Sequence, residues 1–83
     1  LVIINPLQRI CALLQKLTEE GRSKDLIEDA PTHQEMAIMV NLTRETVTRA
    51  FQVLQSQGAL ARDGDNLKVD AAKLKQMAEK SSD

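Results

Sequence analysis

Residues 32–58, THQEMAIMVNLTRETVTRAFQVLQSQG, carry apolar side chains at the spacing of amphipathic helices. On a helical wheel of about 100° per residue, one side of a first helix collects Met36, Ala37, Met39 and Val40. A second helix has an apolar stripe made of Val47, Ala50, Phe51 and Leu54. The pattern predicts two short helices, each with one face turned into a core.

Capping residues mark where these two helices begin and end. Thr32 and Glu35 form a capping box, T-x-x-E, at the start of the first helix. The apolar run stops at Asn41, a residue that tolerates the left-handed backbone of a tight turn. Thr43 can cap the second helix and Gly58 can stop it. The stretch is therefore predicted to be a helix-turn-helix whose second helix covers residues 44–57.

Another helix is predicted ahead of this unit. Asn5 as N-cap, Pro6 at the first position and Gln8 at the third are typical of a helix start, and Gly21 ends the segment. The apolar face of this helix consists of Leu7, Ile10, Cys11, Leu14 and Leu17. The charged stretch that follows has one apolar pair, which predicts a loop with a short strand at residues 26–28.

The C-terminal part predicts a hairpin and a last helix. Leu60, Leu67 and Val69 flank a D-G-D-N turn of the kind that joins antiparallel strands. Asp70 can cap the helix that follows, with an inward face of Ala71, Leu74 and Met77 or Ala78. A hairpin behind a helix-turn-helix is the arrangement of a winged helix. We therefore expect a mainly α fold with a small β wing.

The chain is expected to be one small domain over residues 5–80. It begins with Leu1 rather than Met, which favours a fragment of a longer protein, with residues 1–4 as the remnant of an interdomain hinge or dimerisation helix. Residues 81–83 are expected to be a frayed tail. No apolar run approaches membrane-spanning length and no signal peptide is visible, so the expected location is cytoplasmic.

Composition excludes several classes of function. The 83 residues contain one Phe and no Trp or Tyr, which excludes stacking on single-stranded nucleic acid. With one Cys and one His there is no internal disulfide and no structural zinc site. No nucleophile–base pair, phosphate-binding glycine loop or metal cluster is present, so we do not expect an enzyme or a cofactor in this part of the chain.

The outer arc of the second helix carries the candidate chemistry, with Arg44, Glu45, Thr48, Arg49 and Gln52. Arginine can donate two hydrogen bonds to guanine, and glutamate can accept one from cytosine N4. A helix of this type inserts its N-terminal residues into the major groove. The net charge of −1 is low for a DNA-binding protein, although residues 32–62 carry three Arg against two Glu. We therefore expect weak, salt-sensitive binding by the isolated domain.

The string T-R-E-T-V-T-R at residues 43–49, with the Leu and Gly rhythm that continues to Leu60, resembles the DNA-binding domain of the Crp/Fnr transcription regulators. The resemblance implies that Arg44, Glu45 and Arg49 read base edges of a TGTGA-like half-site. Thr48, which lies between the arginines on the outer arc, is a further candidate for a base contact. It also implies that Thr43 and Thr46 contact phosphates.

Three further residues are expected to contact the DNA backbone: His33, Gln34 and Arg62. Lys68, on the second strand of the hairpin, could approach phosphates as well. His33 stands where some family members have a phosphate-binding arginine. The resemblance further implies a homodimer with an N-terminal effector domain, often for a cyclic nucleotide, and RNA polymerase as a possible partner.

Two alternatives remain open. GntR-type winged helices share a similar T-V-x-x-A-x-x-x-L-x-x-x-G pattern. A winged-helix module that binds protein instead of DNA is the second, since fold alone does not determine function. The apolar Ile38, which the wheel places opposite the packed face, and the low charge favour it.

Overall fold

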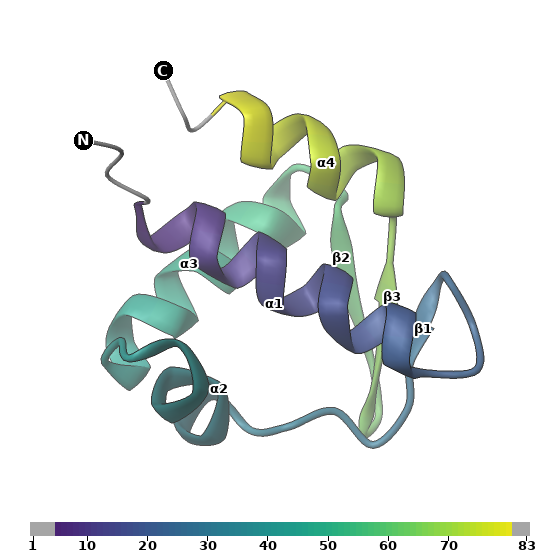
Figure 1. Cartoon of the computed structure of the whole chain (residues 1–83), viewed down its shortest axis with the longest axis horizontal. Coiled ribbons are helices and arrows are strands. Elements are labelled where there is room, and N and C mark those ends of the chain that lie inside the picture. Colours follow the sequence, from purple (N-terminus) through teal and green to yellow (C-terminus); the bar gives the residue numbers. More distant parts are fainter. Residues whose placement is uncertain (1–4, 81–83) are drawn as a thin grey trace.

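Four helices and three short strands form within residues 5–80, the part of the chain that the computed structural model describes (Figure 1). In chain order they are α1 (Pro6–Glu20), β1 (Leu26–Ile27), α2 (His33–Val40), α3 (Arg44–Ser56), β2 (Leu60–Asp63), β3 (Asn66–Val69) and α4 (Ala71–Lys80). This is a winged helix-turn-helix, as the sequence predicted. The expectations for residues 1–4 and 81–83 concern residues outside the described range.

The helices begin at the capping residues that the sequence indicates. Asn5 and Gln8 form a reciprocal capping box, with the Gln8 N–H donating to Asn5 Oδ1 at 2.9 Å. Thr32 and Glu35 form the same motif at the start of α2. The Lys73 N–H donates to Asp70 Oδ1 at 3.0 Å, so Asp70 caps α4. Each cap satisfies a backbone donor that the helix itself leaves unpaired.

A three-stranded antiparallel sheet with the order β1-β3-β2 forms the wing side of the domain. Gly64 adopts φ 64° as the first of the two residues between β2 and β3, which a type II′ hairpin turn requires. The short β1, predicted as a short strand over residues 26–28, pairs with β3 through Leu26↔Lys68 and Ile27↔Leu67. The sheet therefore joins the segment before α2 to the hairpin after α3.

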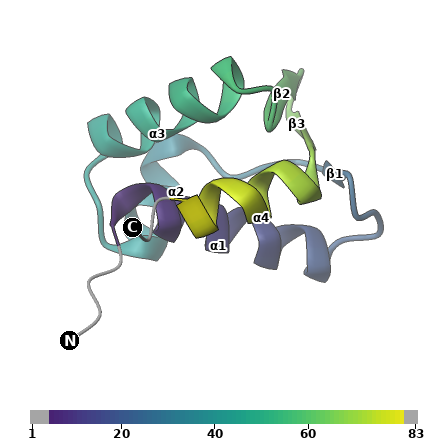
Figure 2. The same ribbon diagram turned by 90° about the horizontal axis from the view of Figure 1, so that it is seen from above.

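The core lies where α1, α2 and α3 meet the inner face of the sheet, with α4 packed beside α1 (Figures 1 and 2). Its buried hydrophobic side chains are Ile10, Cys11, Leu13, Leu14, Ile27, Met36, Ala37, Val47, Ala50, Phe51, Leu54, Ala59, Leu60, Leu67, Val69 and Leu74. Aliphatic side chains supply nearly all of this core, as the composition indicates.

Two of the predicted inward residues are exposed. Met39 has 54% of its surface exposed. The buried arc of α2 is centred between Met36 and Ala37, and at about 100° per residue Met39 lies roughly 110° from that centre. Ala71 is also exposed. Of the other residues predicted on the inward face of α4, Leu74 is fully buried and Met77 and Ala78 are half-buried. The assignment of both residues to the core was wrong.

Val47→Asp is expected to unfold the domain, because Val47 is fully buried in the centre of the core. A carboxylate there loses its hydration without gaining a partner, a cost on the order of 4 kcal/mol or more against the total stability of a small domain. Thermal unfolding followed by circular dichroism measures the effect.

Val53→Asp is the matched control on the same helix, since Val53 is 44% exposed. We expect it to change the free energy of unfolding by less than about 1 kcal/mol. Equal melting temperatures for the two variants would contradict the assignment of the buried face of α3.

Candidate nucleic-acid interface

The turn between α2 and α3 is closed by backbone hydrogen bonds. Asn41 has left-handed dihedral angles, φ 57° and ψ 49°. The Leu42 N–H donates to the Ala37 carbonyl at 2.8 Å and the Asn41 N–H to the Ile38 carbonyl at 3.4 Å. This pair of bonds is a Schellman motif, and asparagine is one of the few residues other than glycine that adopts its left-handed position. The turn therefore starts α3 after only three residues.

Thr43 fixes the beginning of α3. Its hydroxyl oxygen accepts from the Thr46 N–H at 3.2 Å and lies 2.8 Å from the Thr46 hydroxyl. Both hydroxyls lie at the first turn of α3, where Thr43 is exposed and Thr46 is half-buried. Whether they also contact phosphates, as the resemblance implies, stays a prediction.

The outer face of α3 presents charged and amide side chains to solvent. Arg44, Glu45, Arg49 and Gln52 are all exposed. In Figure 2, α3 runs along one side of the molecule, with α1 and α4 on the opposite side. The long side chains of α3 can therefore approach a second molecule without interference from the other helices.

The structure places Thr48 differently from the sequence-based expectation, in contact with His33. Thr48 Oγ1 lies 2.9 Å from His33 Nδ1, a hydrogen bond between α3 and the first residue of α2. The imidazole ring packs against Phe51, with ring centroids 4.4 Å apart and an interplanar angle of 54°. His33 Nε2 is buried and has no hydrogen-bond partner among residues 5–80. Both side chains are half-buried and pair with each other between the helices, whereas the sequence placed Thr48 on the outer arc. Whether either side chain also contacts DNA stays a prediction.

Nearby charges and burial act on the first turn of α2. Burial lowers the pKa of His33, and the positive charges of Arg62 and Arg44 lower it further, so the ring is neutral at pH 7. Hydrogen bonds from the backbone and hydroxyl of Thr32 lower the pKa of Glu35, which keeps this cap ionised. Gln34, the other backbone-contact candidate on α2, is exposed.

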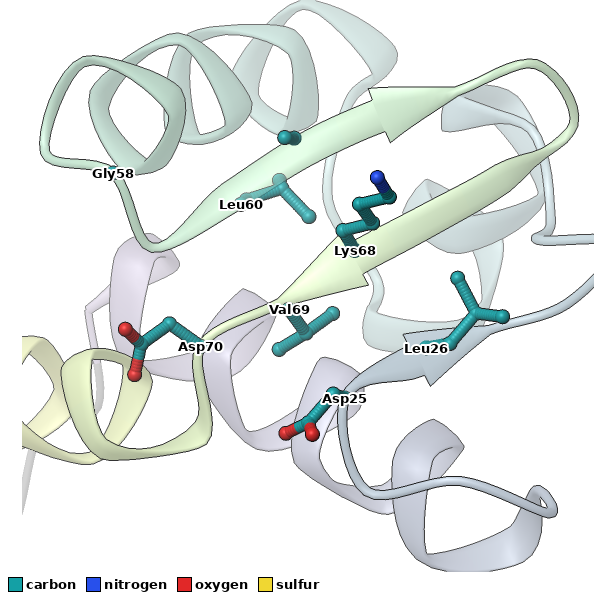
Figure 3. A pocket seen from close by; sticks show the side chains of 8 residues that line it. Asp25, Leu26, Gly58, Leu60, Lys68, Val69 and Asp70 are labelled. Atoms are coloured by element: carbon teal, nitrogen blue, oxygen red, sulfur yellow. The ribbon is translucent and has the colours of Figure 1, made fainter.

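Strand register separates the two basic residues of the wing. Arg62 pairs with Leu67 and therefore shares the inner face of the sheet, toward α2 and His33. Lys68 pairs with Leu26 and Ala61 on the other face, where these side chains line a shallow hollow between Asp25 and Asp70 (Figure 3). Only Arg62 of the two lies on the same side as the helix-turn-helix. Whether Lys68 contacts phosphates from the other face of the sheet stays a prediction.

Two hydrogen bonds tie the tip of the wing to the segment before α2. The Ala30 N–H donates to the Asp65 carbonyl at 2.9 Å, and the Asp29 N–H donates to Asn66 Oδ1 at 3.0 Å. Asp29 adopts a positive φ of 49° in this segment. The bonds hold the wing in one position relative to the N-terminus of α2. No sequence signal predicted them, because they join residues that are 35 and 37 positions apart.

Residues 5–80 contain no group of three or more His, Cys, Asp or Glu side chains that could hold a metal ion. Within the same range no helix is both long and apolar enough to span a bilayer. Cys11 is buried in α1, and burial raises the pKa of its thiol to about 11. A thiol in this environment is a packing group and not a nucleophile.

Comparison with known proteins points to one family. Residues 8–77 match the family model described as a Crp-like helix-turn-helix domain. No curated protein sequence is significantly similar to the chain.

Solved structures share the fold. FixK2 from Bradyrhizobium japonicum has a TM-score of 0.77 and 20% identity, covering 87% of this chain and 37% of that one. The Catabolite Activator Protein of Thermus thermophilus has a TM-score of 0.72 and 28% identity, covering 90% of this chain and 34% of that one. A transcriptional regulator of the CRP/FNR family, also from Thermus thermophilus, has a TM-score of 0.70 and 28% identity, covering 88% and 40%. The chain spans well under half the length of each of these proteins.

Thr43→Ala is expected to lower the free energy of unfolding by about 1 kcal/mol in the absence of any ligand, because it removes the N-cap of α3. Chemical denaturation, analysed with one m-value for all variants, measures this change. Ser56→Ala removes another exposed hydroxyl of α3 and is expected to stay within about 0.5 kcal/mol of the parent chain. Equal effects of the two substitutions would show that Thr43 has no capping role.

Proposed function

Because this chain belongs to the family of Crp-like helix-turn-helix domains, we propose that it binds double-stranded DNA sequence-specifically, with α3 in the major groove. The observation that carries the proposal is the exposed row of Arg44, Glu45 and Arg49 on the N-terminal half of α3. The two arginines are five positions apart, a rise of about 7.5 Å along a helix axis. This rise is comparable with two base-pair steps of about 3.4 Å each.

Each of these side chains has a defined chemical role in the proposal. Arg44 and Arg49 donate paired hydrogen bonds to guanine O6 and N7, and Glu45 accepts from cytosine N4. A TGTGA-like half-site, which the family resemblance implies, offers guanines and, on the opposite strand, cytosines at short spacing. Thr48 and His33 support α3 from within in this proposal.

The DNA backbone contacts are assigned to residues at the rim of the outer face. Thr43, Thr46 and Gln34 lie at the first turns of α3 and α2, where free N–H groups and the helix dipole favour phosphate. Arg62 extends this surface from the wing, on the sheet face turned toward α2. Phosphate contacts orient the protein on the duplex, and base contacts select the sequence.

The longer relatives support a place for this domain in a larger regulator. We propose that it works in a homodimer, which presents two recognition helices to the two halves of a palindromic site. An effector-binding domain and contact with RNA polymerase belong to the same proposal. No catalytic role is assigned to the residues of this domain.

The exposed apolar side chains of α2 favour a second candidate. Ile38 is 72% exposed and Met39 54% exposed. Large apolar side chains exposed together on one short helix favour a protein-binding surface. A protein-interaction module without DNA binding would use this surface instead of α3.

An amide-shift titration by NMR distinguishes the two candidates. The duplexes are a palindrome with two TGTGA-type half-sites and a scrambled sequence of equal composition, at low salt. If α3 reads DNA, the amide signals of residues 43–49 are expected to shift most, and to shift further with the palindrome than with the scrambled duplex. Equal, small shifts with both duplexes would contradict sequence specificity, and no shifts at all would favour the protein-binding alternative.

Arg49→Ala is expected to remove most of the preference for the palindrome while the domain stays folded, because Arg49 is exposed. A paired arginine–guanine contact contributes about 1–3 kcal/mol of discrimination, which corresponds to a factor of roughly 5 to 150 in the ratio of dissociation constants. The ratio is measured from the same titration.

Lys75→Ala is the control for charge alone. Lys75 is an exposed cation on α4, and the helix α4 lies on the opposite side of the molecule from α3 (Figure 2). The substitution removes the same charge, so general electrostatic attraction falls about equally in both variants. If Lys75→Ala lowered the preference as much as Arg49→Ala, base reading by Arg49 would be excluded.

A further inference from the structure

A polar link joins the two helices of the proposed DNA-binding unit inside their packed interface. His33 is the first residue of α2, and Thr48 lies in the second turn of α3. Their side chains meet at 2.9 Å, and the imidazole also rests on the ring of Phe51. This one ring therefore contacts α3 through a directional hydrogen bond and a packed aromatic face.

The unpartnered nitrogen of His33 indicates which form of the ring fits. Nε2 is buried, and no group in the described part of the chain forms a hydrogen bond with it. A buried N–H without an acceptor is costlier and rarer than a buried lone pair without a donor. The structure assigns the proton of the neutral ring to Nδ1, which then donates to Thr48 Oγ1. A second proton would have to sit on Nε2, where no acceptor receives it.

The charged groups around this ring also oppose a second proton. Arg44 faces it from α3 and Arg62 from β2, and both are cations. Glu35, on the same helix as His33, has its carboxylate engaged by the Thr32 N–H at 2.9 Å. Burial and the two arginines lower the pKa of His33 from its ordinary 6.5. The interface therefore accommodates the neutral ring and disfavours the imidazolium.

We propose that neutral His33 is a positioning residue that holds α3 in the orientation needed to read bases. A second proton, on the buried Nε2, drives the charged ring out toward water and so breaks the hydrogen bond between Nδ1 and Thr48 Oγ1. The proposal rests on the proposed DNA-binding function. Arg44 lies four residues before Thr48 and so on the same side of α3. A movement at Thr48 therefore displaces Arg44 at the tip of the recognition helix.

The direction of the pH effect follows from the lowered pKa. The unfolded chain takes up a proton as pH falls through the ordinary value of about 6.5, before the folded chain does. The His33–Thr48 link therefore contributes fully to the free energy of unfolding above about pH 6.5. This contribution is lost as the pH falls through the lower pKa that His33 has in the folded state. Plain electrostatics predicts the opposite trend for DNA, because an added positive charge strengthens general attraction to phosphate.

The test measures the specificity ratio of the 83-residue chain, which is the dissociation constant for the scrambled duplex divided by that for the palindrome. It is measured from pH 8 downward until the NMR signals of the His33 ring show that the ring is protonated. In parallel, NMR follows the His33 ring protons and the amides of α3 in the free protein. We expect the ratio to fall about fivefold as the ring becomes protonated, the effect of one neutral hydrogen bond of about 1 kcal/mol.

Two variants isolate the hydrogen bond. Thr48→Val keeps the size of the side chain but removes the hydroxyl, so its ratio is expected to be low already at pH 8 and to change little with pH. His33→Asn places an amide N–H near the position of Nδ1 without a group that titrates. It is expected to retain most of the ratio at pH 8 and to keep that value at the lowest pH of the series. Circular dichroism confirms that each variant is folded.

Several results would overturn the proposal. A ratio that is constant while the His33 ring titrates would exclude a positioning role. Thr48→Val with the full pH dependence of the parent chain would place the effect elsewhere. If the parent chain shows no duplex preference at any pH, the proposed DNA binding fails. The link between His33 and Thr48 is then tested by NMR of the free protein. Amide shifts of α3 that follow the His33 titration and vanish in Thr48→Val would support the link, and their absence would refute it.

Discussion

The packing of α2 on α3 is the contact on which the rest of this structure depends. α2 has eight residues, too few to be stable as an isolated helix in water. It persists because Met36 and Ala37 are buried in the same core cluster as Val47 and Phe51 of α3. Once these faces are buried, the opposite side of α3 has to face solvent. The placement of the exposed arginines is thus a consequence of core packing.

The wing is part of the same mechanical unit. β1 precedes α2 and pairs with β3, and the loop after β1 is bonded to the turn of the hairpin. The hairpin therefore has a fixed relation to the start of α2. Because paired residues in antiparallel strands share a face of the sheet, Arg62 faces the helices and Lys68 faces away from them.

The low net charge of this domain makes the directed contacts of the outer face of α3 more important for the proposed DNA binding. A net charge of −1 gives little general attraction to DNA, so the proposed binding has to rely on a small number of directed contacts. Such contacts are sensitive to small displacements of the side chains that make them. Under these conditions an internal link such as His33–Thr48 matters more than it would in a strongly basic protein.

The sequence alone determined the order of the elements, their caps and most of the buried faces. Capping boxes, the Asn41 turn and the Asp-Gly turn of the hairpin are local, and residues three to four positions apart specify them. The outward position of Arg44, Glu45 and Arg49 followed from the helical period, and the structure has all three exposed. The contacts of these residues with DNA remain a prediction.

Only the tertiary structure decided the inner positions of His33 and Thr48, the exposure of Met39 and the separation of Arg62 from Lys68. A helical wheel gives the angle of a side chain around its own helix. It does not show how much of the helix surface the neighbouring element covers. His33 and Thr48 are 15 residues apart and lie at the edges of their apolar stripes, where the crossing of the helices determines burial. Strand register has the same origin. It depends on pairing between segments as distant as β1 and β3, and no local pattern in either segment specifies that pairing.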